Sequence, residues 1–248
     1  MAGIVFMMGQ AWVMDLFESE LRVIEAAEEL AATLGADKNH TVAAAAMDTN
    51  GVIHRAVNVY HFTGGPCAEF VVMGLAATKG SAPLVSMAAA GDGGRGLMPP
   101  CGRCRQAMLD IHPDIMVAVL TDSGPQMRPV RKLLPDTYFF PDADSRRLLR
   151  FSKKYYDAVA NGTKVTTVRF DDPVVPGPYI FVFENDAAHR TLNGMVTNVE
   201  HYRLDQMTAE QACLAPGECM DEFRGGLRAR YPELSDEDEV GVVEFELI

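Results

Sequence analysis

The sequence predicts an α/β protein with two domains: a layered α/β domain over residues 1–140 and a strand-rich α+β domain over residues 141–248. Three observations lead to this prediction. Helical and strand patterns alternate in the first part, and strand patterns dominate the second. Between the two parts, Pro135, Pro141 and the polar run 142–145 interrupt both patterns. A chain of 248 residues can form two ordinary domains.

The first domain is predicted to begin with an amphipathic helix over residues 15–34, where apolar residues recur at helical spacing. Two short apolar runs follow, separated by residues 48–51, and the Asn-Gly pair in that segment is typical of a hairpin turn. Further on, the patterns predict a helix over 67–80, a strand over 83–90, a loop over 91–100, a helix over 101–113 and a strand over 114–120. This order predicts three αβα layers, with helices on both faces of a mixed sheet.

The second domain is predicted to open with a helix over residues 145–162, with Gly162 near its C-cap. Because strands dominate the remainder, a small barrel-like α+β domain is expected. Its predicted elements are strands over 163–170, 178–185 and 191–204, a helix near 218–230 and a closing strand over 240–247.

Composition narrows the classes of function. The formal net charge is -12, and a division at residue 140 gives 10 basic and 14 acidic residues before it (net -4) and 12 and 20 after it (net -8). This charge argues against broad electrostatic binding of nucleic acid, although a small local basic patch is still compatible with it.

No apolar run is long enough to span a membrane, and the first 14 residues lack the basic region and cleavage site of a signal peptide. A cytoplasmic protein is therefore expected.

Three of the five cysteines have the spacing of metal ligands. Cys67 lies two residues before Glu69, and Cys101 and Cys104 form a C-x-x-C pair. A catalytic zinc typically takes three protein ligands and keeps a fourth position for water. Cys67 and Cys101 each follow a proline and open a predicted helix, whose N-terminal N–H groups stabilise thiolates. The pattern predicts one Zn²⁺ per chain, with Glu69 beside the water as a proton carrier.

Two other interpretations of these cysteines are open: buried structural cysteines, or a structural zinc with four ligands. The candidates for a fourth ligand are weak, because two of them fall in the second domain and the other two have no supporting spacing. These candidates are Cys213, Cys219, His61 and His112.

The segments P-C-A-E and P-C-G-x-C-R-Q resemble the cytidine deaminase superfamily in its all-cysteine zinc version. Over residues 12–140, chiefly in 57–74, 91–113 and 131–138, the chain resembles the blasticidin S deaminase branch of that superfamily. The resemblance implies the αβα deaminase fold and a homo-oligomer, a tetramer or dimer, with active sites at subunit interfaces. It also implies zinc-dependent hydrolytic removal of the N4 amine of a cytosine nucleoside.

In that resemblance, Glu69 protonates ring atom N3 and then the departing ammonia, and main-chain groups around Ala68 and Pro100 hold the pyrimidine. Many cytidine deaminases bind the sugar through Asn-x-Glu; here Asn58 is present and Tyr60 takes the place of the glutamate. The substrate is therefore blasticidin S, cytidine, deoxycytidine or another modified cytosine nucleoside. Where those enzymes often carry Arg after C-A-E, this chain has Phe70.

Three thiolates leave the zinc site with a net charge of -1, which weakens the acidification of water. Arg103, between two of the cysteines, is the candidate for the compensating cation, and the alternative is a solvated loop residue.

Two other motifs are predicted to lack the function that they suggest. Residues 91–96 satisfy G-x-G-x-x-G, but no helix follows to receive a pyrophosphate, so a flexible loop that lines the deaminase pocket is expected instead. The acidic run 235–239 is expected to be a solvated turn rather than a cation site.

Residues 146–248 resemble the ASCH domain, a barrel related to RNA-binding PUA domains, through GTKVTTVR and the closing strand. Some ASCH proteins deacetylate N4-acetylcytidine with a Lys, a Thr three residues later and a distant Glu. Lys164 and Thr167 match the first two positions, and Glu218 is the candidate for the third. Lys164 and Arg169 could equally form a ligand-binding patch without chemistry.

The leading prediction is a zinc-dependent aminohydrolase that deaminates a cytosine nucleoside and carries an ASCH domain that binds or deacylates a modified cytosine nucleoside. The alternative is an RNA-binding ASCH module that directs the deaminase to a base within RNA, which the low basic content does not favour. A third possibility, a degenerate deaminase kept as a scaffold, disagrees with the complete Cys67, Glu69, Cys101 and Cys104 set.

Overall fold

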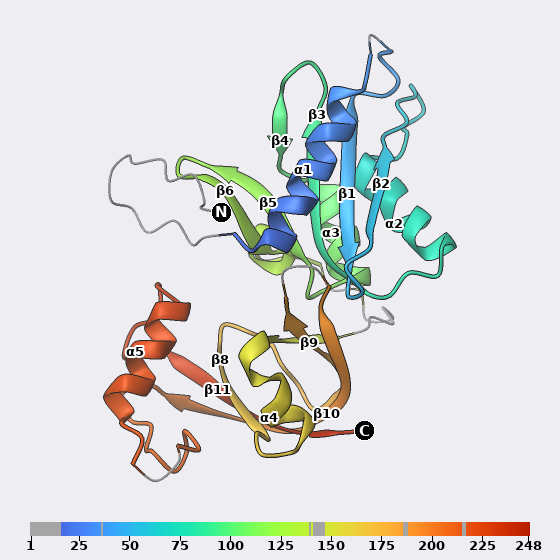
Figure 1. Ribbon diagram of the computed structural model, residues 1–248. Coiled ribbons are helices and arrows are strands. Elements are labelled where there is room, and N and C mark those ends of the chain that lie inside the picture. The colour runs from blue at the N-terminus through green and yellow to red at the C-terminus, as the bar shows by residue number, and fades with distance from the viewer. Residues whose placement is uncertain (1–15, 36, 139, 141–146, 186–187, 215–216) are drawn as a thin grey trace, which may run out of the picture. The chain divides into compact units, whose positions relative to one another are not determined.

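A computed structural model describes residues 16–35, 37–138, 140, 147–185, 188–214 and 217–248 (Figure 1). The chain divides into two compact units: residues 1–146 with 185–189, and residues 147–184 with 190–248. Among the described residues, no helix is long and apolar enough to cross a membrane. The features predicted within residues 1–14 and 141–146 lie outside the described residues.

The first unit is built on a mixed six-stranded sheet in the order β2-β1-β3-β5-β6, with β4 also pairing with β3. Among the strands that the structure describes here, β3 and β5 run parallel and the remaining pairs are antiparallel. The predicted hairpin is confirmed as the β1–β2 pair. The strands are β1 (Val42–Asp48), β2 (Ile53–Val57), β3 (Leu84–Gly91), β4 (Gly96–Met98), β5 (Met116–Thr121) and β6 (Gly124–Pro129).

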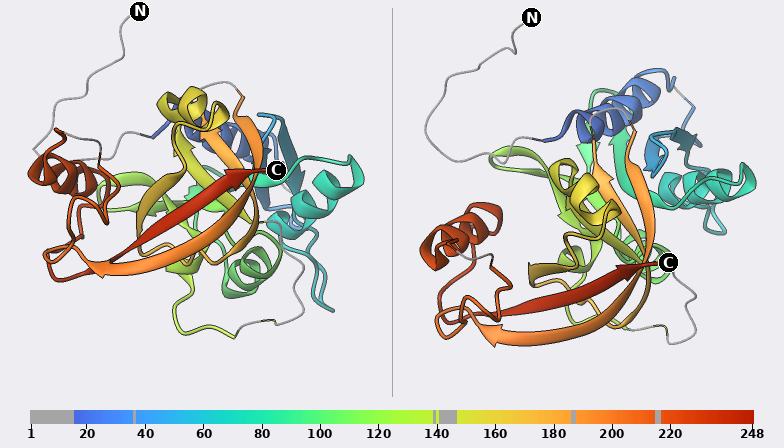
Figure 2. Two further views of the ribbon diagram at one scale, coloured as in Figure 1. Left: turned by 90° about the horizontal axis from the view of Figure 1, so that it is seen from below. Right: turned by 60° about the horizontal axis from the view of Figure 1, so that its bottom comes forward.

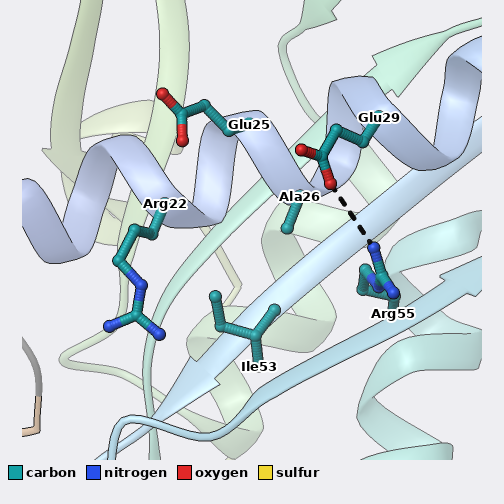
Figure 3. Close-up of a pocket in the computed structure, with 6 residues that line it drawn as sticks. All are labelled: Arg22, Glu25, Ala26, Glu29, Ile53 and Arg55. Carbon is teal, nitrogen blue, oxygen red and sulfur yellow. Dashed lines mark ion pairs between the residues drawn. The ribbon is translucent and has the colours of Figure 1, made fainter.

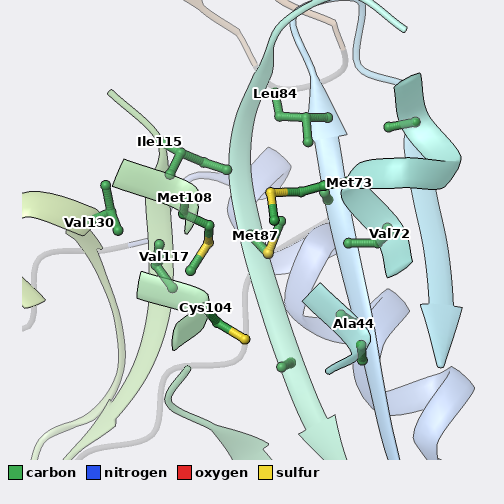
Figure 4. Packing of buried hydrophobic residues seen from close by; sticks show 14 residues of the cluster. Ala44, Val72, Met73, Leu84, Met87, Cys104, Met108, Ile115, Val117 and Val130 are labelled. Atoms are coloured by element: carbon green, nitrogen blue, oxygen red, sulfur yellow. The ribbon is translucent and has the colours of Figure 1, made fainter. Parts of the chain in front are cut away.

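Helices cover both faces of this sheet, as the sequence predicts. Helix α1 (Glu18–Ala32) packs on one face, and helices α2 (Ala68–Thr78) and α3 (Gly102–Ile111) pack on the other (Figure 1). The central strands β1 and β3 are buried along almost their whole length and are rich in alanine, because both of their faces are covered. Figure 4 shows the core between the sheet and the helices α2 and α3, which includes Cys104.

Two strands of the first unit differ from the prediction. Residues 91–100 were expected to be a loop, but Gly96–Met98 forms β4 and closes a tight hairpin with β3. Gly93, Gly94 and Gly96 have positive φ angles of 57°, 78° and 65°, which the turn requires and which glycine adopts without strain. Strand β6 was not predicted, because its two prolines suit only an edge strand.

The far end of α3 carries a half-buried histidine that makes folding stability depend on pH. Burial lowers the pKa of His112 to about 4. The unfolded chain therefore binds a proton near pH 6.5 that the folded chain binds only near pH 4, so stability falls as the pH drops through this window. We expect metal-free protein to lose roughly 2–3 kcal/mol between pH 7 and pH 4.5 from this residue. Urea unfolding at both pH values measures the loss, and His112→Gln should remove that share of it.

The second unit contains one five-stranded sheet in the order β7-β9-β10-β11-β8. The pairs are antiparallel except β7–β9, which is parallel. Strand β10 is long and strongly curved (Figure 2), and its register with β11 shifts between Val196 and Asn198, a β-bulge that increases local twist. The elements are β7 (Leu148–Ser152), α4 (Tyr156–Ala160), β8 (Thr166–Phe170), β9 (Gly177–Glu184), β10 (Arg190–Arg203), α5 (Met220–Arg230) and β11 (Glu239–Leu247).

The predicted helix over residues 145–162 is wrong in its described first part. Residues Leu148–Ser152 form strand β7, a 3-10 turn follows over Lys153–Tyr155, and only Tyr156–Ala160 is α-helical. The helix end is as predicted: Asn161 is the C-cap, and Gly162 follows with a φ of 75°.

The predicted barrel is present only as a curled sheet, because the pairing of the described strands starts at β7 and ends at β8 without joining these two edges. One side chain bridges them: Arg169 of β8 donates a hydrogen bond to the carbonyl of Arg150 in β7, and its guanidinium lies 5.1 Å from the centre of the Phe151 ring. Phe151 also packs against Phe181 and Phe245 on the inner face. A Cβ on Gly194 would lie 2.1 Å from the Phe181 ring, so this position requires glycine.

Candidate zinc centre and active site

A closed loop places Cys67 at the start of α2. The backbone N–H of Val59 bonds to the carbonyl of Pro66, at 3.1 Å, so residues 59–66 return to the point where they began. This return requires Gly65, because a Cβ there would lie 1.6 Å from the Val59 carbonyl oxygen. Cys67 follows as the N-cap residue of α2, as predicted.

Cys101 and Cys104 come from the start of α3. Strand β4 leads into Pro99 and Pro100, and Cys101 is the N-cap residue of α3. Cys104 lies inside the first turns of the helix and is completely buried. Helices α2 and α3 lie on the same face of the sheet, and the three sulfur atoms meet near the N-termini of these helices.

The three sulfur atoms fit a single zinc ion. The Sγ atoms of Cys67 and Cys101 lie 3.8 Å apart, those of Cys101 and Cys104 lie 3.5 Å apart, and all three lie within 4.8 Å of one another. In a tetrahedral site with Zn–S bonds of about 2.3 Å, sulfur atoms are about 3.8 Å apart. All five cysteines are free thiols, and among the described residues no other group of His, Cys, Asp and Glu side chains is arranged to hold a metal.

The backbone favours a thiolate at Cys101. Burial would raise the pKa of Cys101, but hydrogen bonds from the Cys104 backbone N–H, the Cys104 thiol and the Cys67 thiol outweigh burial and lower this pKa. A donating backbone N–H at a helix N-terminus is the feature that stabilises thiolates for metal binding.

Glu69 lies beside the sulfur atoms in the first turn of α2 and is only 5% exposed. Burial raises the pKa of its carboxyl group, and hydrogen bonds with its own backbone N–H and with the Cys104 thiol oppose this effect in part. A buried carboxyl group with a raised pKa next to a metal position can both accept and donate a proton near neutral pH.

The weak candidates for a fourth ligand stay outside the cluster. His61 bonds to Thr63 and stacks on Phe62 in the loop before Cys67. His112 is the C-cap residue of α3, at the end of the helix opposite Cys101. Cys213 and Cys219 belong to the second unit. Among the described residues, only the three cysteines are therefore arranged to hold a metal, and a zinc ion bound by three protein ligands would keep its fourth position for water.

Arg103 lies over an aromatic ring next to the cluster. Its guanidinium carbon is 4.6 Å from the centre of the ring of Phe70, the residue that follows Glu69, and the Arg103 side chain is exposed.

Asn58 has a structural role that the sequence did not suggest. Its Oδ1 accepts hydrogen bonds from the backbone N–H groups of Thr41, at 2.7 Å, and Val42, at 2.9 Å. This pairing fixes the orientation of the amide and leaves Nδ2, a donor, as the group that can face a ligand. Tyr60, two residues further on, is 63% exposed.

The main-chain groups predicted near the pyrimidine differ in their surroundings. Ala68 is completely buried in the first turn of α2. The carbonyl of Pro100 already accepts a hydrogen bond from Arg105, at 2.8 Å. The glycine-rich turn before it is also held in place, since Arg95 bonds to Asp92 and to the carbonyl of Thr41.

A shallow pocket of about 290 Å³ lies elsewhere in the first unit, between α1 and the edge strand β2 (Figure 3). Two of its charged residues, Arg55 and Glu29, form an ion pair at 3.7 Å (Figure 3). Because α1 covers the face of the sheet opposite α2 and α3, this pocket is separate from the cysteines.

The residues predicted to form a site in the second unit are partly brought together. Lys164 is half-buried, and its Nζ lies 4.9 Å from the centre of the Tyr155 ring. Burial and the charge of Arg169 lower the pKa of Lys164, while the charges of Cys213 and Glu218 raise it, so these groups lie within electrostatic reach of each other. Thr167 and Arg169 are two residues apart on β8, so their side chains lie on the same face of the sheet.

The acidic run 235–239 forms a turn, as predicted: the Ser235 N–H bonds to Asp238 at 2.7 Å, and Asp236 pairs with Arg228.

Comparison with known proteins agrees with this geometry. Residues 18–120 match the family model described as the cytidine and deoxycytidylate deaminase zinc-binding region. The first unit therefore carries a zinc-binding region of the cytidine deaminase type, and Zn²⁺ is the metal that its cysteines suit.

Among individual proteins, the chain is similar to the blasticidin-S deaminase of Bacillus cereus, with 26% identity over 133 residues that cover 50% of this chain and 95% of the relative. It is also similar to the crystal structure of cytidine deaminase from Mycobacterium tuberculosis, with 26% identity, 50% and 95% coverage and a TM-score of 0.38. For the cytidine deaminase of Burkholderia pseudomallei, the identity is 25%, the coverage is 48% and 98%, and the TM-score is 0.39.

Proposed function

We propose that the first unit removes the N4 amine of a cytosine nucleoside by hydrolysis and releases the uracil product and ammonia. The observation that carries this proposal is the position of Glu69, a buried carboxyl group with a raised pKa directly beside three cysteines with the spacing of a zinc site. Cys67, Cys101 and Cys104 would hold the metal, and three ligands leave one position for water.

The bound zinc supplies Lewis-acid activation of the attacking water. Glu69 would accept one proton of that water and pass it to N3 of the ring; it would then take the second proton from the hydroxyl group added at C4 and pass it to the departing amine, so that water supplies both protons. Arg103, which lies over Phe70 and stands between two of the cysteines in the sequence, is the proposed compensating cation for three thiolates whose combined charge exceeds that of the metal by one. Asn58 offers its Nδ2 donor to an oxygen acceptor of the sugar or of the group in its place.

The substrate class is proposed to be blasticidin S, cytidine, deoxycytidine or a related modified cytosine nucleoside. Tyr60 replaces a carboxylate with an exposed phenol, so the site lacks the negative acceptor that would bind the second sugar hydroxyl. An acidic chain also favours a cationic nucleoside over a polyanion.

The decrease in ultraviolet absorbance on conversion of a cytosine to a uracil ring tests this proposal with cytidine, deoxycytidine, cytosine and blasticidin S. Turnover of at least one nucleoside and ammonia release in equal amount are expected. Zinc-loaded protein that converts none of the four would contradict the proposal. Light scattering of the same sample tests the proposed homo-oligomer, a tetramer or dimer.

For the second unit, we propose an ASCH-type domain that binds or deacylates an N4-acylated cytosine nucleoside. The supporting observation is Lys164, whose half-buried ammonium lies on the Tyr155 ring and whose pKa is lowered by burial and by Arg169. A lowered lysine pKa favours the neutral amine, which can act as a base toward Thr167. Glu218 is the proposed carboxylate partner.

We expect the protein to release acetate from N4-acetylcytidine and expect Lys164→Ala to reduce the rate at least about 100-fold. Lys38→Ala is the control, because Lys38 is an exposed lysine of the first unit and lies outside the proposed site. Intact deamination without acetate release would leave binding as the only role. A gel shift with structured RNA tests the alternative that this unit directs the deaminase to RNA.

A further inference from the structure

The ligand Cys104 is followed on α3 by two polar side chains, Arg105 and Gln106, that the proposed reaction does not use. Both side chains make hydrogen bonds to a segment far along the chain, to the carbonyls of Leu133 and Tyr138. We call residues 133–138 the tether. The tether comes after β6, begins at the last residue of the 3-10 turn Val130–Leu133, and is hydrogen-bonded to the helix that carries Cys104.

Arg105 connects the tether to the backbone of a zinc ligand. Its Nε donates to the carbonyl of Pro100 at 2.8 Å, and its Nη1 donates to the carbonyl of Leu133 at 2.7 Å. Pro100 directly precedes Cys101. The planar guanidinium can donate to two carbonyl groups at fixed angles, which a lysine ammonium cannot reproduce.

Cys101 needs such a support more than the other two ligands do. It is the exposed member of the cluster, whereas Cys67 is half-buried and Cys104 is buried. Like Cys67, it is an N-cap residue and lies outside the helix with extended backbone angles (φ -68°, ψ 165°). The helical hydrogen bonds that fix Cys104 do not fix the peptide between Pro100 and Cys101. Arg105 holds this peptide at its carbonyl oxygen.

Gln106 also binds the tether, but its hydrogen bonds go to Asp110, Thr137 and Tyr138 rather than to the Pro100 carbonyl. Its Nε2 donates to the Tyr138 carbonyl at 3.0 Å and to Asp110 at 2.9 Å, and its Oε1 accepts from the Thr137 hydroxyl at 2.6 Å. Both side chains therefore anchor the tether. Arg105 has the further role of binding the Pro100 carbonyl, which Gln106 does not share.

We propose that Arg105 is a positioning residue of the zinc centre: by holding the Pro100 carbonyl against the tether, it fixes the backbone from which Cys101 reaches the metal. The inference rests on the zinc centre of the proposed function and not on the reaction. Through Arg105, the affinity for Zn²⁺ depends on the tether, which lies about thirty residues along the chain from Cys104.

The experiment compares Arg105→Ala, Arg105→Lys and Gln106→Ala with the unchanged protein in Zn²⁺ competition against a chromophoric chelator. Loss of a partner that orients a metal ligand typically weakens metal binding 10–100-fold, and we expect this range for Arg105→Ala. Arg105→Lys should weaken binding by a smaller factor. Gln106→Ala should change zinc affinity less than about twofold, although both alanine variants loosen the tether and lower the melting temperature.

Two further measurements keep the outcome decisive. The absorption of the Co²⁺-loaded proteins reports the geometry of the thiolates and should shift for Arg105→Ala but not for Gln106→Ala. Circular dichroism shows whether each variant folds, and Arg105→Lys decides the question if Arg105→Ala does not fold. Unchanged zinc affinity in a folded Arg105 variant, or an equal loss in Gln106→Ala, would overturn the proposal. Because Zn²⁺ alone is the probe, a protein that binds zinc but deaminates nothing refutes the proposed function and leaves this inference standing.

Discussion

Replacing Glu69 with glutamine is expected to reduce kcat for cytosine nucleosides by roughly 10³–10⁴-fold while zinc stays bound, because the amide cannot exchange protons with water, N3 and the leaving amine. Glutamine has almost the same size, and the 5% exposed position in the first turn of α2 can accept it without a cavity. The absorbance assay measures kcat, and atomic emission measures the zinc content.

Glu29→Gln provides the matched control, because Glu29 is an exposed glutamate on α1, whose layer does not carry the cysteines. This variant should keep full activity and full zinc content. If Glu69→Gln turned over substrate at the normal rate, Glu69 would not be the proton carrier. If it lost its zinc together with its activity, the carboxyl group would be supporting the metal site instead.

Cys101→Ser is expected to lower the affinity for Zn²⁺ by several orders of magnitude and to abolish deamination. A serine hydroxyl does not replace a thiolate as a ligand for a borderline-soft ion, and the remaining two sulfur atoms cannot hold a catalytic zinc. Cys67→Ser should have the same effect, because both residues are N-cap residues of the two helices whose starts carry the cluster. Zinc titration with a chromophoric chelator measures the loss.

The chain contains its own controls for this experiment. Cys213 and Cys219 are exposed free thiols in the second unit, and their replacement with serine should leave zinc content and kcat unchanged. A loss of zinc in Cys213→Ser or Cys219→Ser as large as that in Cys101→Ser would show that the second unit supplies a ligand.

The helices, the hairpin and the three cysteines could be predicted because their signals are local. Proline before Cys67 and Cys101 marks a helix start, and the Asn-Gly pair at residues 50 and 51 marks a tight turn. Each of these signals depends on residues within one turn of the chain. Such local signals were therefore enough to predict the cysteine cluster from the sequence alone.

The missed features depend on partners that are distant in sequence. Strand β7 has five residues and pairs in parallel with β9 about thirty residues later, so its Leu and Arg pattern is equally compatible with a helix. The hydrogen bonds from Thr41 to Asn58, and from Arg105 to Leu133, leave no trace in the local pattern. The need for Gly65 is visible only when the loop closes on Val59.

The Arg169 bridge in the second unit has a consequence for self-association. Sheet edges with unpaired backbone groups are templates for another chain, and β7 and β8 are the two edges of this sheet. Here the edges β7 and β8 are not joined by a row of backbone hydrogen bonds. The guanidinium of Arg169, which lies over the Phe151 ring, connects them instead. Arginine at position 169 thus works as protection against intermolecular strand pairing, and its loss would expose two ready sites for aggregation.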